Sequence, residues 1–159
     1  MTQLNERAYV QAPYGRAPQY LKAYLERNGW HLGTPASLSL RVEARDLGLP
    51  GDMSVARDVT AKVNAVDDPT HLTTPLSVEW SPAGGGPFPT FHGTLTISED
   101  EDYGSCVLTL SGEYEPPLGV VGKGFDAVIG RRIAVATARR LLEEIRDGIE
   151  AEQTAEQLK

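Results

Sequence analysis

The segment from Val121 to about Glu152 constrains the fold most, because it has the pattern of one long amphipathic helix. Charged residues such as Arg139, Glu143 and Asp147 occupy one face. A helix of about 30 residues is about 45 Å long. Its apolar stripe therefore needs a broad partner surface, and it comprises Phe125, Val128, Ile129, Ile133, Ala136, Leu141, Leu142, Ile145 and Ile149.

Strand-like segments precede this helix and are the only candidates for that surface. A short strand over Glu6–Ala12 is followed by a helix predicted over Pro18–Asn28. A two-residue alternation of apolar and polar side chains then predicts strands with one buried face and one wet face. Short turns favour an antiparallel meander. The alternating segments are Ala36–Ala44, Met53–Ala65, Leu72–Trp80, Phe91–Ile97 and Cys106–Tyr114.

Together these patterns predict an α+β fold in which a curved antiparallel sheet of six to seven strands wraps around the C-terminal helix. Gly93 and Gly112 fall on the inward face and leave room for curvature. Because a concave sheet cannot press flat on a cylinder, we expect a space between the two, where small apolar ligands bind. We predict one domain over residues 1–153, with a frayed tail over 154–159.

Composition limits the classes of partner. The net charge of −7 disfavours nucleic acid, since no basic stripe offsets it. The single cysteine, Cys106, allows no intrachain disulfide and fits a reducing cytoplasm. The chain has neither a signal-peptide pattern nor 18 consecutive apolar residues, so we expect no membrane insertion. His31, His71 and His92 lack metal-ligand spacing and no nucleotide motif occurs, so we expect no metal or cofactor.

One stretch carries a family resemblance. The strand that ends at Ala12-Pro13, the helix and the strands lead to Leu110-x-Gly112-x-Tyr114-x-Pro116-Pro117-x-Gly119-x-x-Gly122, and then to a long helix with Asp126 near its start. In this order of elements, and most specifically from Gly112 to Asp126, the chain resembles the START-like or Bet v 1-like superfamily of helix-grip proteins. Within that superfamily it is most similar to the bacterial polyketide cyclase/dehydrase-like (SRPBCC) branch.

The chain departs from this family pattern in two ways. It has one predicted helix between the first two strands where many members have two, and six strands where larger members have seven. A further strand near Trp30–Thr34 or Arg45–Leu49 would account for the second difference. The resemblance implies a hydrophobic cavity between sheet and helix. Members bind lipids, sterols, hormones or polyketides, and a minority catalyse cyclisation or dehydration, so the fold does not fix the function.

Arg57 is the most informative candidate for a ligand-binding residue. Its parity places it on the buried face beside Val55 and Val59. A guanidinium stays charged and must find an anion, a carbonyl or water. Arg57 is therefore either an anchor for a carboxylate or carbonyl of an apolar ligand, or an arginine that reaches solvent at a rim or through a bulge.

Five further residues complete the predicted site. Trp80, Phe91 and Tyr114 share the inward parity and either line a pocket, with the Tyr114 hydroxyl as donor, or belong to the core. Phe125 and Ile129 lie on the sheet-facing stripe near the start of the long helix and are expected to form one wall.

Three functions are compatible with these patterns. The first is the binding of a small hydrophobic molecule between sheet and helix. The second is a polyketide cyclase or dehydratase in which Arg57 and Tyr114 polarise a ligand carbonyl, so whether the chain is an enzyme stays open. The third is a protein-interaction module that uses the groove or a sheet edge, as in a homodimer.

Overall fold

The computed structural model describes residues 2–31, 33–43, 54–65, 75–82, 90–115 and 127–158. These residues have the α+β architecture expected from the alternation and helix patterns, an open antiparallel sheet with a long C-terminal helix. The elements are β1 (Thr2–Val10), α1 (Ala17–Arg27), β2 (Ala36–Glu43), β3 (Ser54–Ala65), β4 (Leu76–Pro82), β5 (Thr90–Glu99), β6 (Cys106–Glu115) and α2 (Ala127–Gln157).

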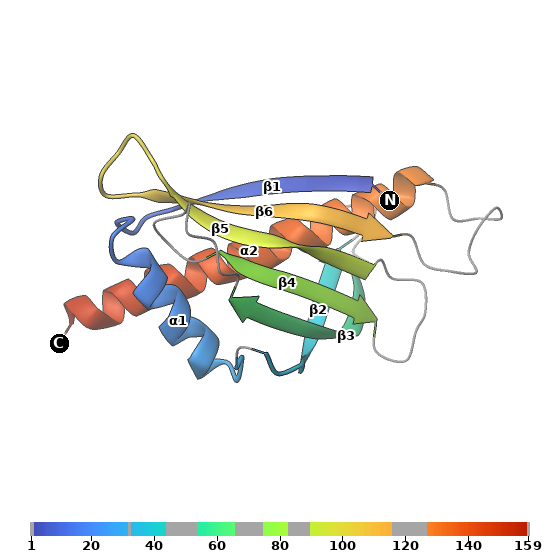
Figure 1. Ribbon diagram of the computed structural model, residues 1–159, viewed down its shortest axis with the longest axis horizontal. Coiled ribbons are helices and arrows are strands. Elements are labelled where there is room, and N and C mark those ends of the chain that lie inside the picture. The colour runs from blue at the N-terminus through green and yellow to red at the C-terminus, as the bar shows by residue number, and fades with distance from the viewer. Residues whose placement is uncertain are drawn as a thin grey trace.

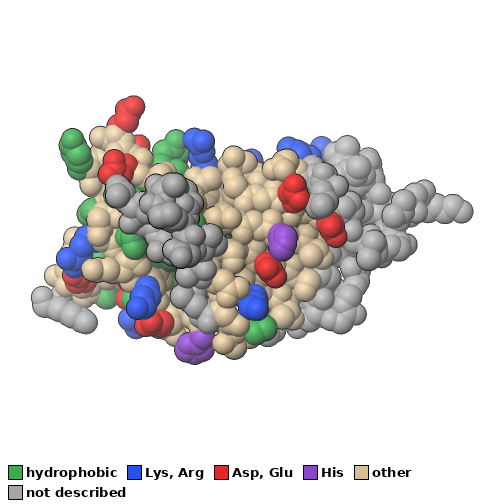
Figure 2. All heavy atoms as spheres, in the orientation of Figure 1, with side chains coloured by type: hydrophobic (Ala, Val, Ile, Leu, Met, Phe, Trp, Pro, Cys, Tyr) green, Lys and Arg blue, Asp and Glu red, His purple; other side chains and the backbone are tan. Residues whose placement is uncertain are grey.

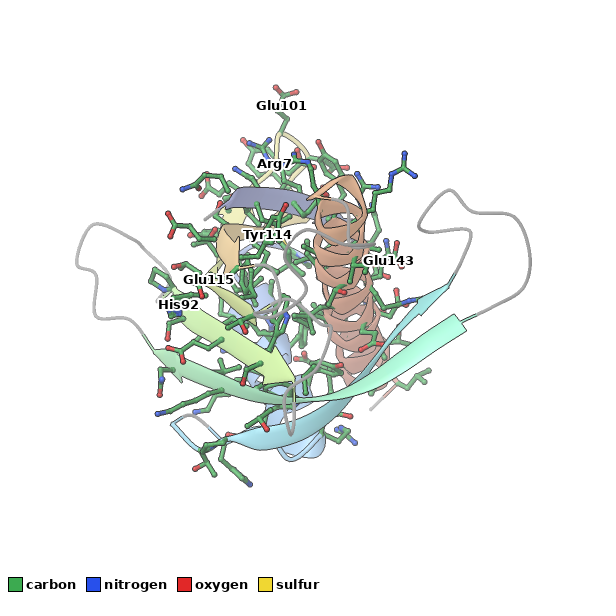
Figure 3. The ribbon with its side chains drawn as sticks, turned by 90° about the vertical axis from the view of Figure 1, so that its right-hand side faces the viewer. Arg7, His92, Glu101, Tyr114, Glu115 and Glu143 are labelled. Carbon is green, nitrogen blue, oxygen red and sulfur yellow. The ribbon has the colours of Figure 1, made fainter. Side chains whose placement is uncertain are left out.

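All described strands form one sheet in the order β1-β6-β5-β4-β3-β2. Each neighbouring pair is antiparallel, so β2 to β6 form the predicted meander. The strand β1 joins at the far edge by pairing with β6. Figure 1 shows α2 running along one side of this sheet, with α1 lying across it towards the C-terminal end. The end-on view of Figure 3 shows the sheet curving around α2.

The helix α2 contacts both edges of the sheet. Its neighbours are β1 and β2 at the two edges, together with β6 and α1. The side chains of α2 that are buried among the described residues recur at helical spacing, which is why one face of the helix can serve the whole sheet. They are Ala134, Ala136, Thr137, Ala138, Leu141, Leu142, Ile145 and Ile149.

The start of β1 and the end of α2 differ from the sequence prediction, which was wrong at both. The strand β1 begins at Thr2, and not at Glu6, because Leu4 is buried and extends the inward row. Glu6 lies on that same inward parity and hides the alternation in the sequence. Its carboxylate accepts a hydrogen bond from Arg139 of α2, with Nε and Oε2 3.0 Å apart, which allows a charge at this position.

The helix α2 also continues past the predicted end at Glu152, to Gln157. Residues 154–157 of the predicted frayed tail thus belong to the helix, and that they fray stays a prediction. Arg27 pairs with Glu152 through Nε and Nη2, at 2.6 and 3.1 Å, and Arg16 pairs with Glu156. These ion pairs attach the last turns of α2 to α1 and to the turn before α1, in a segment of α2 that no longer has an apolar pattern.

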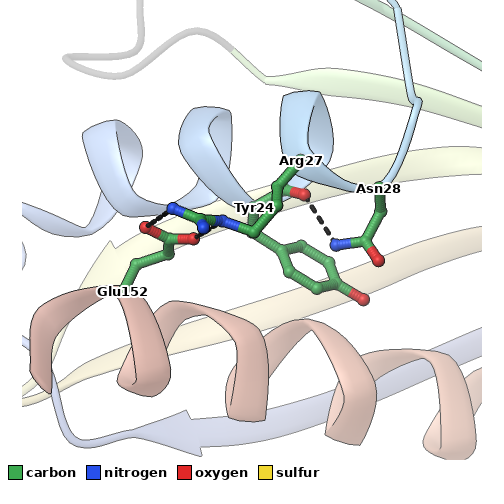
Figure 4. Close-up of polar contacts among 4 residues, drawn as sticks. All are labelled: Tyr24, Arg27, Asn28 and Glu152. Carbon is green, nitrogen blue, oxygen red and sulfur yellow. Dashed lines mark hydrogen bonds and ion pairs between the residues drawn. The ribbon is translucent and has the colours of Figure 1, made fainter. Parts of the chain in front are cut away.

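Local sequence explains both the limits of α1 and its contact with α2. Pro18 lies in its first turn, where the missing amide hydrogen is not needed. The helix stops at Asn28, whose Nδ2 donates to the carbonyl of Tyr24 at 2.8 Å, and Gly29 follows with φ +78°. Figure 4 shows this bond and the Arg27–Glu152 pair. A Cβ on Gly148 would lie 2.2 Å from the Tyr24 ring, so this glycine sets how closely the helices approach.

Gly93 and Gly112 lie directly opposite each other on β5 and β6, facing inwards as predicted. A Cβ on Gly93 would lie 2.3 Å from the Ser111 carbonyl oxygen and 2.5 Å from Cζ of Phe91. The Phe91 ring thus lies over the surface that the two glycines leave open. The room predicted at these positions is occupied by a side chain of the protein itself.

The extra strand considered at Trp30–Thr34 does not form in residues 30, 31, 33 and 34, and Arg45–Leu49 lies outside the described residues. The start of the predicted long helix, residues 121–126, also lies outside them. Among the helices described, neither has a stretch long and apolar enough to cross a membrane.

Candidate functional site

A narrow apolar pocket lies between the sheet and α2, beside α1. Its cavity volume is about 30 Å³. We call it the α1-end pocket. The residues that line it come from α1 and the turn after it, from strands β3 to β6 and from α2: Tyr24, Leu25, Trp30, Val63, Leu76, Val78, Leu95, Leu110, Leu141, Leu142, Glu144 and Ile145.

The polar chemistry of this pocket comes mainly from Tyr24 and Glu144. Glu144 is exposed as a whole residue. Desolvation at the pocket nevertheless raises the pKa of its carboxyl, Arg140 opposes the rise, and Asp147 and Glu143 add to it. The pKa of the Tyr24 hydroxyl is raised by burial and then by the charges of Glu144 and Asp147. The opening thus disfavours negative charge, while the walls behind it are aliphatic.

Three of the predicted site residues lie together at another place on the inner face. Trp80, Phe91 and Tyr114 are direct cross-strand partners on β4, β5 and β6. They are 3%, 1% and 4% exposed, so the predicted inward orientation is confirmed. We call them the aromatic row. Figure 3 shows Tyr114 towards the interior, while His92 and Glu115 point outwards.

The sheet register separates the aromatic row from the α1-end pocket. Leu76, Leu95 and Leu110 form one inward row that lines the pocket. The next inward row contains Val78 and the two facing glycines, and the aromatic row comes after it. None of the three aromatics lines the pocket among the described residues. That they touch a ligand therefore stays a prediction.

Within the aromatic row, Trp80 and Phe91 stack. Their ring centroids are 4.3 Å apart and the planes are inclined by 20°. The indole Nε1 of Trp80 is buried and has no hydrogen-bond partner. It is the single buried side-chain nitrogen or oxygen in this state among the described residues. Such groups are rare in folded proteins because losing water without a replacement is costly.

The other predicted site residues are described less fully. Arg57 lies in β3 with its backbone opposite Leu40, but its side chain is outside the description. The same holds for the side chain of Ile129 in α2, and Phe125 lies wholly outside the described residues. Whether any of the three faces a ligand stays a prediction.

Sequence reasoning missed Tyr24, Trp30 and Glu144 as pocket residues. Tyr24 falls on the apolar stripe of α1, which identifies it as inward-facing but does not indicate where α1 docks. Glu144 belongs to the charged face of α2 by spacing alone. Only the crossing of the two helices beside Gly148 brings these residues to one opening.

Two other candidate groups behave as surface and core residues. His92 is exposed on the outer face of the sheet, where Nδ1 lies 3.7 Å from Oε1 of Glu79. Figure 2 shows acidic, basic and histidine side chains scattered over the described surface in this view. In the described part of the chain no group of three potential ligands could hold a metal ion. Cys106 is fully buried, and desolvation together with Asp100 raises the pKa of its thiol to about 11.

No protein-family model matches the chain, and no curated protein matches it in sequence. Solved structures do match its fold over nearly the whole length. The aromatase/cyclase Zhui from Streptomyces sp. R1128 has a TM-score of 0.58 and 11% identity, covering 96% of this chain and 93% of that one. A conserved protein from Geobacillus kaustophilus has a TM-score of 0.55 and 16% identity, covering 95% and 94%.

A START superfamily protein from Mycobacterium smegmatis has a TM-score of 0.50 and 14% identity, and the match covers 99% of each chain. At these identities the similarity concerns the fold alone. The chain therefore has the START-like, or Bet v 1-like, helix-grip fold, as its sequence resemblance implied.

Proposed function

We propose that this protein binds a small apolar molecule in the space between the sheet and α2. The observation that carries the proposal is the α1-end pocket, whose walls come from three layers of the fold and are almost entirely aliphatic or aromatic. The helix-grip fold, shared with a START protein and an aromatase/cyclase, supports an interior ligand.

The size of the pocket limits how a ligand enters. Because the cavity volume is only about 30 Å³, side chains already fill most of the interior. A ligand larger than a few atoms must therefore displace side chains such as Tyr24 or Leu76 at the pocket edge. Binding would then be accompanied by local repacking, with the mouth near Glu144 as the entrance.

Native mass spectrometry combined with thermal unfolding tests the proposal with a panel of fatty acids, fatty alcohols, flavonoids and small polycyclic aromatics. A ligand at about 100 times its Kd stabilises a protein by about 2.7 kcal/mol. For a chain of this size that raises Tm by roughly 5–10 °C. Bound mass without any rise in Tm, or no bound mass across the panel, would argue against an interior site.

A pair of adjacent residues on β4 supplies the matched control. Leu76 lines the pocket, whereas Ser77 is the next residue and points to the other face of the sheet. Leu76→Trp should fill the space and abolish binding. Ser77→Trp adds the same ring outside and should leave binding unchanged. Equal effects of the two substitutions would mean that the ligand does not occupy the pocket.

The enzymatic alternative is cyclisation or dehydration through Arg57 and Tyr114. Of these two side chains the structure describes only that of Tyr114. Tyr114 is buried within the aromatic row and can present a hydroxyl to an interior ligand.

A protein-interaction role as a homodimer would need a large exposed apolar patch. The large apolar side chains exposed among the described residues are Tyr9, Tyr103 and Leu158. Neither alternative gains a specific supporting observation.

A further inference from the structure

We propose that the indole N–H of Trp80 is the hydrogen-bond donor that recognises an oxygen acceptor on the bound molecule. This inference rests on the proposed function and specifies the chemistry of its ligand. The ligand would be an apolar molecule that carries a carbonyl or ether oxygen, and this oxygen would lie beside the aromatic row.

The first support is the state of the donor itself. Trp80 is 3% exposed, and its Nε1 has no acceptor. A neutral donor that loses water on folding and gains no partner destabilises the fold. A phenylalanine would avoid this cost, so the indole nitrogen is explained best by an acceptor that arrives with a ligand.

The second support is that the indole is held in place. Phe91 stacks on Trp80 with centroids 4.3 Å apart. Phe91 is 1% exposed, and its Cζ lies 2.5 Å from the position that a Cβ of Gly93 would take, so its ring packs on the backbone of that glycine. The indole therefore rests on a ring that is itself buried. A donor fixed before binding loses little entropy when it meets its acceptor.

The third support is the surroundings of the indole. On β3 the residue opposite Trp80 is Ala61, which is 2% exposed and brings only a methyl group to the inner face. On the other side lie Phe91 and Tyr114 in the same row. The next row towards the pocket has Val78 and Gly93. An oxygen in these apolar surroundings makes a stronger hydrogen bond than one in water.

The test uses two probes of the same shape, fluorene and 9-fluorenone, which differ by one carbonyl. The protein contains two tryptophans, Trp30 and Trp80, so an amide NMR spectrum shows two indole N–H signals. The Trp30→Phe variant assigns them. We expect 9-fluorenone to shift the Trp80 indole signal downfield and to bind about 3–10-fold more tightly than fluorene, as one neutral hydrogen bond allows.

Two variants test whether Trp80 acts as a hydrogen-bond donor or only as an aromatic ring that packs in the core. Trp80→Phe keeps an aromatic side chain but removes the N–H, so it should abolish the preference for 9-fluorenone, while any change in packing should affect the affinities for both probes alike. Trp30→Phe removes the other indole N–H, which lies at the α1-end pocket, so it should change the affinities for both probes alike and retain their ratio. Trp30→Phe also keeps Trp80 as the sole tryptophan, and quenching of its selectively excited fluorescence gives an independent Kd.

The possible outcomes distinguish this inference from the function on which it rests. Equal binding of the two probes, with the Trp80 signal unmoved by the carbonyl, would overturn the donor role and leave the binding function standing. A preference that survives in Trp80→Phe would do the same. If neither probe binds and no compound of the larger panel does, the binding function fails and the inference fails with it.

Discussion

The two ends of the inner face differ in how their polar groups are satisfied. At the α1-end pocket, Tyr24 and Glu144 stand at an opening and reach water, although partial burial raises the pKa of both groups. In the aromatic row, Trp80 is buried and stacked on Phe91, and its N–H has no partner. One end therefore resembles an entrance, and the other resembles a recognition surface.

This difference indicates which of the two regions would discriminate between ligands. A polar group that is already hydrated gives up water when it binds, so its net gain is small. A buried donor without a partner has already lost its water during folding. A hydrogen bond to a ligand acceptor is then not opposed by desolvation of the donor, so it contributes more to the binding free energy. Under the proposed function, a ligand would therefore enter at the α1-end pocket and be discriminated at the aromatic row.

The largest effect should come from enlarging the glycines that shape the two ends. Gly93→Val places a Cβ against the backbone oxygen of Ser111, which cannot move away without disrupting β6. We expect a loss of about 3 kcal/mol in unfolding free energy. In Gly148→Ala the three atoms nearest to the new Cβ all belong to the Tyr24 side chain, and the better helix propensity of alanine offsets about 1 kcal/mol. Its net loss should be about 1 kcal/mol.

Urea unfolding of the two variants measures this contrast. A Gly148→Ala variant that is less stable than Gly93→Val would reverse the expected order. It would mean that the helix crossing, and not the strand pair under the aromatic row, is the tighter part of the interior.

A smaller effect is expected at the pocket mouth, where Glu144 titrates. Because burial raises its pKa in the folded protein above the ordinary 4.5, the protonated form favours folding. The stability from this group is present below pH 4.5 and is lost as the pH rises through the folded pKa. Glu144→Gln should therefore raise Tm slightly at pH 7, and the difference from the parent should disappear below pH 4.5.

Thermal unfolding from pH 3.5 to 8 follows this difference. Glu143→Gln is the matched control, since Glu143 is the exposed neighbour on α2 and does not line the pocket. A Tm gain of the same size and pH profile in both variants would show that general charge repulsion along α2 causes it, and not the pocket mouth.

The smallest signal should come from Cys106, which lies in the core and not at the mouth. Burial raises the pKa of its thiol to about 11, so the reactive thiolate is scarce at pH 8. We expect a thiol reagent such as DTNB to react with the native protein no faster than the protein opens, and rapidly in urea. Fast labelling of the native protein would show that the interior is open beyond the α1-end pocket.

The same thiol has a consequence for alkaline stability. Its folded pKa of about 11 exceeds the ordinary value of 9.0, so its contribution is complete below pH 9 and is lost as the pH rises towards 11. Cys106→Ala should remove this part of the alkaline decline in Tm.

Much of the sheet could be predicted from the sequence, because burial on one face leaves a two-residue alternation. That pattern placed Trp80, Phe91 and Tyr114 inwards, and they are buried. It could not place Glu6 inwards, since the partner that allows a charge there is Arg139, 133 residues away. Long-range pairs of this kind leave no local signal.

The candidate site was less predictable for a related reason. The α1-end pocket depends on where α1 crosses α2, which is set by Tyr24 against Gly148 and by Arg27 with Glu152. Helical spacing identifies which face of a helix is apolar but not which partner covers it. The unpartnered nitrogen of Trp80 depends on the absence of an acceptor in three dimensions, which sequence spacing does not encode.

The pairing of β1 with β6 has a consequence for synthesis of the chain. Gln3 and Glu113 hydrogen-bond across this pair although they are 110 residues apart. At ribosomal rates of about 5–20 residues per second, β1 therefore waits for about 5–20 s before its partner is made. During that interval its backbone groups are available to other nascent chains. Because β1 pairs with β6 so late, aggregation during translation should limit the yield of this protein. Chaperones that suppress this aggregation should raise the yield.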